Sequence, residues 1–173
     1  MTPPVIASFR VIHVIAGCFW LGTMLMNAGF LLPAVGAAGP AGGQVMKQVV
    51  QVRRLPLFLN AAVLLVLITG GILFWWASGG FNVSWLSSAA GIGWTIGGLL
   101  AIAAALLGYF VNAPTARRLG QLAAKAQAAG GPPSETIASE MKQLQSRLLR
   151  ATQLAAVLLV LATAAMAAAR YLG

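Results

Sequence analysis

The only histidine of the chain, His13, is the residue best suited to chemistry. Arg10 comes three residues earlier, and Gly17 and Trp20 follow at spacings of four and three, so the four share one helical face. The stretch around them is apolar, and an ionisable side chain inside such a stretch is typical of a functional site in a membrane. Imidazole is a common ligand of haem iron and of other metals.

A second group of candidate residues lies near the end of the sequence. If the chain crosses a membrane four times, Met166 comes to about the depth of His13, with Arg170 at the rim. Histidine and methionine form an axial pair for haem iron, and arginine binds carboxylates such as haem propionates. Glycine leaves room for a flat group. The residues predict a haem b site formed by His13, Met166, Arg10, Arg170, Gly17, Trp20 and Gly97.

Two other interpretations of the same residues remain open. His13 and Met166 could instead ligate copper or another soft metal, because Cu(I) prefers Cys, Met and His. Cys18 is five residues from His13 and points about 140° around the helix, so it would be a poor third ligand. Alternatively no cofactor is bound, His13 hydrogen-bonds a neighbouring helix, and the glycines serve close packing.

The sequence shows no catalytic residues for acid–base work. Its two acidic residues, Glu135 and Glu140, lie in a polar stretch outside the apolar segments. There is no His–carboxylate pair, phosphate-binding loop or CxxC motif. These observations favour a protein that is not an enzyme.

The composition indicates which elements must position these residues. Of 173 residues, 60% are hydrophobic and 8% are charged, and the mean hydropathy is +0.87. Soluble domains carry about 25% charged residues, so a soluble enzyme and a disordered chain are excluded. A single cysteine excludes a disulfide scaffold.

Four apolar stretches are long enough to cross a bilayer core of about 30 Å. None contains an acidic residue or the alternation of a strand, and small residues recur every four positions in the third, as expected where helices pack closely. We expect an all-α, four-transmembrane-helix up-down bundle in a single membrane domain, residues 1–173. The predicted spans are about 11–32, 55–77, 91–112 and 152–169.

The basic residues predict the orientation of this bundle. Three lie in the first loop and six in the third, which makes nine of the 11, while the second loop has none. The positive-inside rule places the first and third loops in the cytoplasm and both termini outside. Topology explains the net charge of +9, so no nucleic acid is needed as a partner. The basic loops of such a bundle would contact the lipid bilayer.

The loops carry further expected structure. Pro33 and the glycine-rich residues 36–43 predict a loop, followed by an amphipathic segment over 44–54. Residues 114–150 predict a cytoplasmic helical hairpin that either packs internally or docks a partner. The third transmembrane helix would continue to about Ala129, and the fourth would run from about Ser134 to Tyr171. The Gly130–Pro133 break would separate the two. We expect Pro56 and Pro114 to shape helix ends.

Several short motifs carry a resemblance. His13 with Trp20-Leu21-Gly22 and Leu32-Pro33, Asn112-Ala113-Pro114 with Arg117-Arg118-Leu119, and the closing segment Met166–Leu172 resemble bacterial copper-resistance-D-like membrane proteins and their small four-span relatives. The resemblance implies a helical bundle in the bacterial cytoplasmic (inner) membrane, and copper handling is the label of the larger members.

A second resemblance is to four-span haem-containing protoporphyrinogen oxidases, which share a first-span His followed by Trp and Gly. They also use a lysine in the third span, and residues 91–112 contain none, so that activity is not expected here.

Together these observations favour a small integral membrane protein that acts as a non-enzymatic accessory or oligomeric subunit. It would be a homo-oligomer or part of a larger membrane complex, with a haem or metal held at His13 in the outer half of the bundle. Two alternatives are a haem-dependent membrane oxidoreductase or electron carrier, and a copper or small-solute permease with a polar path through Asn27 and Asn60.

Overall fold

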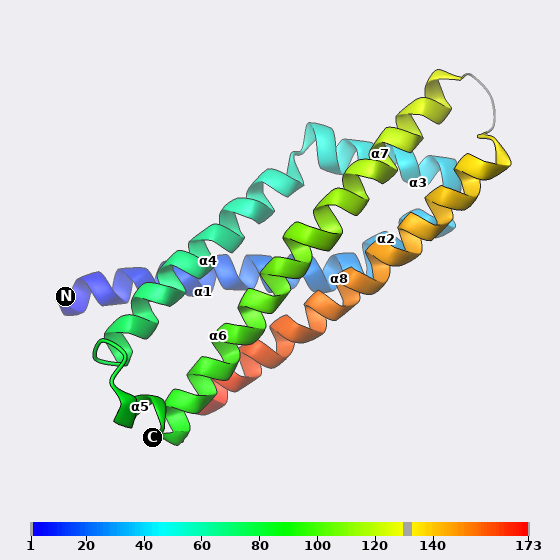
Figure 1. Ribbon diagram of the computed structural model, residues 1–173. Coiled ribbons are helices and arrows are strands. Elements are labelled where there is room, and N and C mark those ends of the chain that lie inside the picture. The colour runs from blue at the N-terminus through cyan, green and yellow to red at the C-terminus, as the bar shows by residue number, and fades with distance from the viewer. Residues whose placement is uncertain (1, 130–132, 173) are drawn as a thin grey trace.

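The computed structural model describes residues 2–129 and 133–172, and within them the chain is helical with no strand (Figure 1). The predicted all-α, multi-pass membrane fold is confirmed, because four helical stretches are long and apolar enough to cross a membrane. These stretches are Pro3–Ala37, Leu55–Ala77, Ala89–Ala128 and Glu135–Ala169.

The first stretch is longer than predicted, because Pro33 does not end it. Helix α1 (Pro3–Met26) continues through a π-helical turn, η1 (Asn27–Leu31), into α2 (Leu32–Ala37). Proline lacks an N–H, and its ring clashes with the carbonyl four residues back in an α-helix. Here the Leu32 N–H bonds the Asn27 carbonyl, five residues back, and the widened turn makes room for the ring. The predicted loop at Pro33 is therefore wrong.

The third stretch also contains a proline that a π-helical turn accommodates. Helix α6 (Ala89–Leu107) passes through η3 (Gly108–Asn112) into α7 (Ala113–Ala128), and the Ala113 N–H bonds the Gly108 carbonyl just before Pro114. Pro114 thus lies inside a continuous helix and does not end one, contrary to expectation. The predicted extension of this helix to about Ala129 is confirmed.

The glycine-rich segment folds into helix as well. Helix α3 (Gly39–Lys47) packs back on α2 after a turn in which Gly39 has φ +57°, and a π-helical turn, η2 (Gln48–Val52), follows. At Gly42 the two helices meet so closely that a Cβ would overlap the Val35 carbonyl. Arg54 then takes a left-handed conformation (φ 53°), and α4 (Leu55–Ala77) begins with Pro56 in its first turn, where proline is tolerated.

The long helices form two antiparallel pairs. Helix α1 packs along α4, and α6 packs along α8 (Glu135–Ala169), whereas α4 touches α6 only sparsely. In Figure 1, α4, α6 and α8 run side by side and α1 crosses them at an angle. The α6–α8 pair is held by small residues, since a Cβ on Gly93 would lie 2.7 Å from the Ala169 Cβ.

The pairs meet where α1 crosses α8, and Trp20 fills that crossing. Its side chain is 4% exposed, although neighbouring side chains of α1 face outward. This placement explains a tryptophan far from the membrane surface. The cluster around it comes from α1, α4, α6 and α8: Ala16, Met24, Ala28, Ala62, Val66, Ala104, Ala155, Ala156 and Leu159.

The predicted helical hairpin is formed by α7 and the first half of α8. Leu122 is 3% exposed, so the apolar face of α7 packs inside the protein, where α7 contacts α8. Arg118 Nε donates to Glu140 Oε1 at 2.9 Å and links the two helices. The Ser134 hydroxyl caps α8 by accepting from the Ile137 N–H, which confirms the predicted start. Residues 130–132 of the predicted break lie outside the described residues.

Candidate functional site

His13 lies in the seam between α1 and α4, half-buried. Its Nδ1 is 3.1 Å from the Val66 carbonyl oxygen and 3.1 Å from the Thr69 hydroxyl oxygen, both on α4. Gly70 leaves the space for the ring, since a Cβ there would lie 2.9 Å from His13 Cε1. Three contacts from one turn of α4, at Val66, Thr69 and Gly70, thus hold the imidazole in one orientation.

The partners of Nδ1 define where the proton of a neutral ring sits. The Val66 carbonyl can only accept a hydrogen bond. The Thr69 hydroxyl donates its one hydrogen to the Leu65 carbonyl at 2.5 Å, so towards His13 it also accepts. Nδ1 must therefore carry the hydrogen and donate, and Nε2 keeps its lone pair. Among the described residues Nε2 has no hydrogen-bond partner.

The site lies inside the predicted membrane region. Thr69 is six residues before Trp75 in α4, which corresponds to about 9 Å of helix. Trp75 and Trp76 are half exposed at the end of α4, as expected of tryptophans at a membrane surface. The imidazole therefore lies roughly two helical turns below the membrane surface. At that depth few hydrogen-bond donors are available to Nε2.

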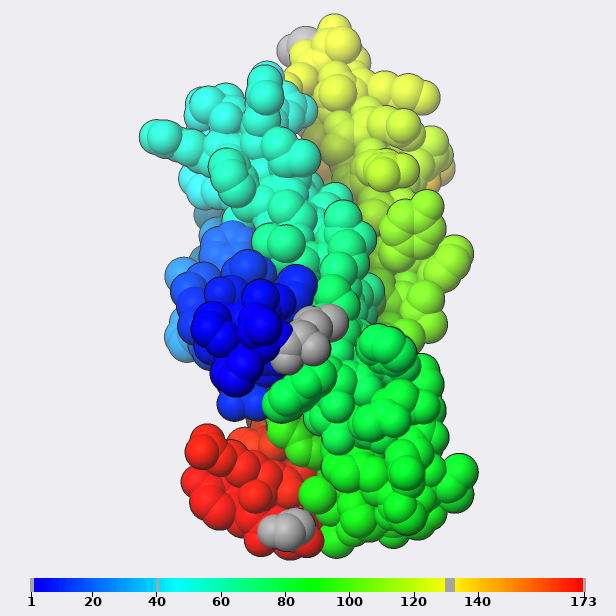
Figure 2. All heavy atoms as spheres, turned by 90° about the vertical axis from the view of Figure 1, so that its left-hand side faces the viewer, coloured from blue at the N-terminus to red at the C-terminus, as the bar shows by residue number. Residues whose placement is uncertain are grey.

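The structure places Met166, the predicted second axial ligand, in a different seam from His13. Met166 packs in the α6–α8 seam: a Cβ on Gly97 would be 2.6 Å from Met166 Cγ and 3.0 Å from the Ala162 carbonyl oxygen. His13 packs in the α1–α4 seam, so the two predicted axial ligands have different packing partners. Figure 2 shows the N-terminal part of α1 (blue) and the C-terminal part of α8 (red) as separate bulges with an indentation between them.

Arg10, Arg170, Gly17 and Trp20 also differ in their surroundings. Arg10 and Arg170 are exposed, and Gly17 lies beside α4, with Val66 Cγ2 4.0 Å from where its Cβ would be. Trp20 belongs to the core and lines no site. Of the predicted set, only Arg10 and Gly17 lie within one helical turn of His13 on the same helix.

The remaining polar side chains of the described residues form no cluster that could hold a metal ion. Within residues 2–129 and 133–172, no three His, Cys, Asp or Glu side chains lie close enough to hold a metal, and Cys18 is exposed. Asn60 faces outward from α4, and Asn27 is half-buried in η1. Asn112 Oδ1 is buried without a hydrogen-bond partner among the described atoms.

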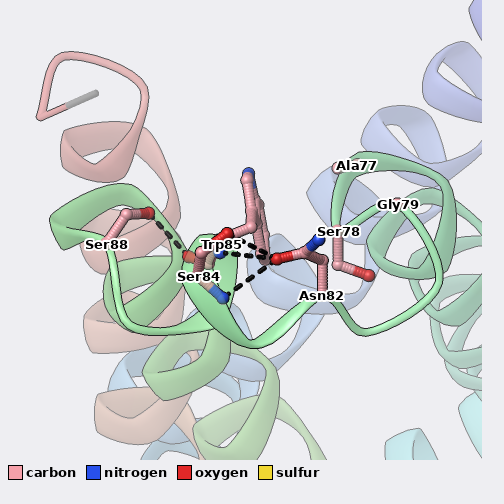
Figure 3. A pocket seen from close by; sticks show the side chains of 7 residues that line it. All are labelled: Ala77, Ser78, Gly79, Asn82, Ser84, Trp85 and Ser88. Carbon is pink, nitrogen blue, oxygen red and sulfur yellow. Dashed lines mark hydrogen bonds between the residues drawn. The ribbon is translucent and has the colours of Figure 1, made fainter.

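A shallow hollow of about 390 Å³ lies in the connection between α4 and α6, which includes the short helix α5 (Val83–Leu86) (Figure 3). Polar side chains that line it already accept hydrogen bonds from backbone N–H groups. Asn82 Oδ1 accepts from the Ser84 and Trp85 N–H groups, and the Ser88 hydroxyl accepts from the Gly91 N–H. These side chains are helix caps, so the hollow offers a ligand little unsatisfied polarity. A second open hollow, of about 700 Å³, lies between α3 and the end of α7.

A glycine pair allows the His13 seam to be tested. We expect Gly70→Ala to displace the imidazole, because the new methyl group would lie 2.9 Å from Cε1, whereas Gly71→Ala adds a methyl group with nothing within 4 Å. The chain has one histidine, so NMR of protein labelled with ¹⁵N-histidine reports this ring alone. The imidazole signals should shift in Gly70→Ala and stay unchanged in Gly71→Ala. Equal spectra in both variants would contradict the described seam.

The sequence identified His13 but not the groups that orient it. Thr69 is one of few polar residues in the second span, which is a weak signal. The Val66 carbonyl is a backbone group and leaves no mark in the sequence. Comparisons of the chain with protein-family models, with curated proteins and with solved structures find no match. The two family resemblances therefore stay predictions.

Proposed function

We propose that the protein is a small, non-enzymatic membrane subunit that binds haem b through Nε2 of His13. The observation that supports this most is the bonding of Nδ1. A histidine that ligates a metal almost always donates its other ring N–H to a carbonyl, carboxylate or water, which sets the tautomer and the ring orientation. His13 has this arrangement, with the Val66 carbonyl as acceptor and Nε2 unprotonated.

The surroundings of His13 fit a single axial ligand to haem. Arg10 is exposed one turn earlier on α1 and could pair with a propionate. Bound haem would supply one-electron redox chemistry. Copper is a poorer fit, because the seam brings no second soft ligand to His13.

A single axial ligand is also a reason to propose an assembly. Because Met166 packs against Gly97, a second axial ligand would come from another copy or from another subunit. This supports a homo-oligomer or an accessory subunit of a larger membrane complex. The chain lacks a His–carboxylate pair near His13, which favours a binding role over an enzyme.

The distribution of charge supports a location and an orientation for this subunit. Basic residues gather at the end formed by α2, α3, α7 and the first half of α8, which we name the basic end. By the positive-inside rule we place this end in the bacterial cytoplasm and both termini outside the cytoplasmic membrane. The His13 site then lies in the outer half.

The proposal is tested by the absorption spectrum of gently purified protein produced with ample haem. We expect a Soret band and reduced α-band in the wild type, and their loss in His13→Ala. Met166→Leu should keep both bands, because Met166 is not a ligand in this account. Melting curves of all three proteins show whether each is folded. A wild type without haem after reconstitution, or bands that persist in folded His13→Ala, would overturn the proposal.

A further inference from the structure

The register between α6–α7 and α8 brings the arginines of these helices to one level. Gly93 lies against Ala169, and Gly97 against Met166 and Ala162, so the helices are antiparallel with a fixed offset. The ion pair between Arg118 and Glu140 continues this register along the hairpin. Extending the offset places two arginines of α8 beside the segment 108–116. They are Arg147 and Arg150.

The start of α4 reaches the same level. A short connection joins α4 to α6, the two helices run side by side, and 22 residues separate Ala77 from Leu55 (Figure 1). Leu55 therefore lies about level with the end of η3. Arg53 and Arg54 immediately precede it. Arg54 holds the left-handed backbone conformation that glycine or asparagine would adopt at lower cost.

Six arginines thus lie in one band at this end, just before α4, on α7 and on α8, and all six are exposed. Among the described residues only Arg118 forms an ion pair. Of the three lysines, Lys47 on α3 and Lys125 on α7 lie nearer the tip of the hairpin. The register of α7 and α8 places Lys142 opposite residues 116–121, level with Arg117 and Arg118. We name the band the arginine collar: Arg53, Arg54, Arg117, Arg118, Arg147 and Arg150.

Aromatic side chains mark the membrane surface just below the collar. Phe58 is 59% exposed on α4, and Tyr109 and Phe110 are 72% and 65% exposed on η3. Aromatic residues gather at the boundary between acyl chains and headgroups. Arg54 is four residues beyond Phe58, about 6 Å along the chain, and Arg117 is seven beyond Phe110, about 10 Å. The collar therefore lies at the level of lipid phosphates.

We propose that the arginine collar binds the phosphate groups of anionic phospholipids in the leaflet at the basic end. Arginine presents a planar fork that donates two hydrogen bonds to one phosphate, which lysine cannot do. Six of the seven basic side chains at this level are arginines, and Lys47 and Lys125 lie beyond it, which matches this recognition. The proposal is independent of haem binding, since the collar and His13 are at opposite ends of the bundle.

The experiment uses the full chain in nanodiscs of phosphatidylcholine mixed with phosphatidylglycerol, with native mass spectrometry of the retained lipids. The variant Arg53→Gln/Arg150→Gln is compared with Lys47→Gln/Lys125→Gln, which removes the same charge from the same end but outside the collar. We expect the wild type to retain phosphatidylglycerol preferentially, the arginine variant to lose about tenfold of that preference, and the lysine variant to keep it.

Two further measurements keep the proposal falsifiable. Melting curves in pure phosphatidylcholine show whether the arginine variant folds, and Arg53→Lys/Arg150→Lys keeps the charge while removing the fork. We expect this lysine-for-arginine variant to lose part of the preference. No preference in the wild type, or equal losses in the arginine-to-glutamine and lysine-to-glutamine variants, would overturn the proposal, because general charge attraction would then explain the data.

Discussion

Trp20→Ala is expected to destabilise the folded bundle by about 3–5 kcal/mol, the range for removing a buried aromatic side chain. Trp20 is 4% exposed where α1 crosses α8, and its cluster includes Val66 of α4 and Leu159 of α8. In lipid, packing rather than the hydrophobic effect holds helices together, so the empty volume costs contacts that no acyl chain easily replaces. Equilibrium unfolding in mixed micelles with increasing denaturing detergent measures the change.

The adjacent aromatic residue provides the control. Phe19 is 42% exposed and faces away from the crossing, so Phe19→Ala should change the free energy of unfolding by less than about 1 kcal/mol. If the two variants are equally stable, Trp20 does not connect the α1–α4 and α6–α8 pairs as described here.

Gly42→Ala is expected to open the α2–α3 hairpin. A methyl group at this position would overlap the Val35 carbonyl, and its carbon would lie 2.9 Å from both the Val35 C and Cα atoms. A backbone cannot swing aside as a flexible side chain can, so the cost falls at the upper end of overpacking, about 3 kcal/mol. Hydrogen exchange should increase over residues 32–52 and not in α6 or α8.

Gly43→Ala is the matched control, since nothing lies within 4 Å of the Cβ it would add. It should leave exchange unchanged or slow it slightly, because alanine favours helix over glycine. Protection of residues 32–52 that is the same in both variants would show that α2 and α3 do not approach each other at Gly42.

Much of the fold could be predicted from the sequence, because the signals involved are local or strongly periodic. The apolar stretches, the serine that caps α8 and the small residues between α6 and α8 are of this kind. The prolines were misjudged. Pro33 and Pro114 are ordinary breakers of α-helix, but one extra residue in a π-helical turn accommodates each ring, and no local pattern distinguishes that turn from a helix end.

The site could be predicted only in part. His13 was identified by its residue type inside a span. Met166 was assigned a matching depth, but depth along a helix does not determine which neighbour a side chain faces. That depends on the rotation of α8 against α6, which Gly97 and Ala162 determine by close packing. The Val66 carbonyl orients the imidazole, and this role of a backbone group cannot be inferred from the sequence.

The most direct test of the central claim is the tautomer of His13, read from the ¹⁵N chemical shifts of histidine-labelled wild-type protein in lipid. We expect a neutral ring protonated at Nδ1, with an unprotonated Nε2 signal that changes or broadens when haem is added. The Val66 and Thr69 contacts demand this tautomer. A ring protonated at Nε2, or an Nε2 signal unaffected by saturating haem, would contradict the claim that this atom is the ligand of the site.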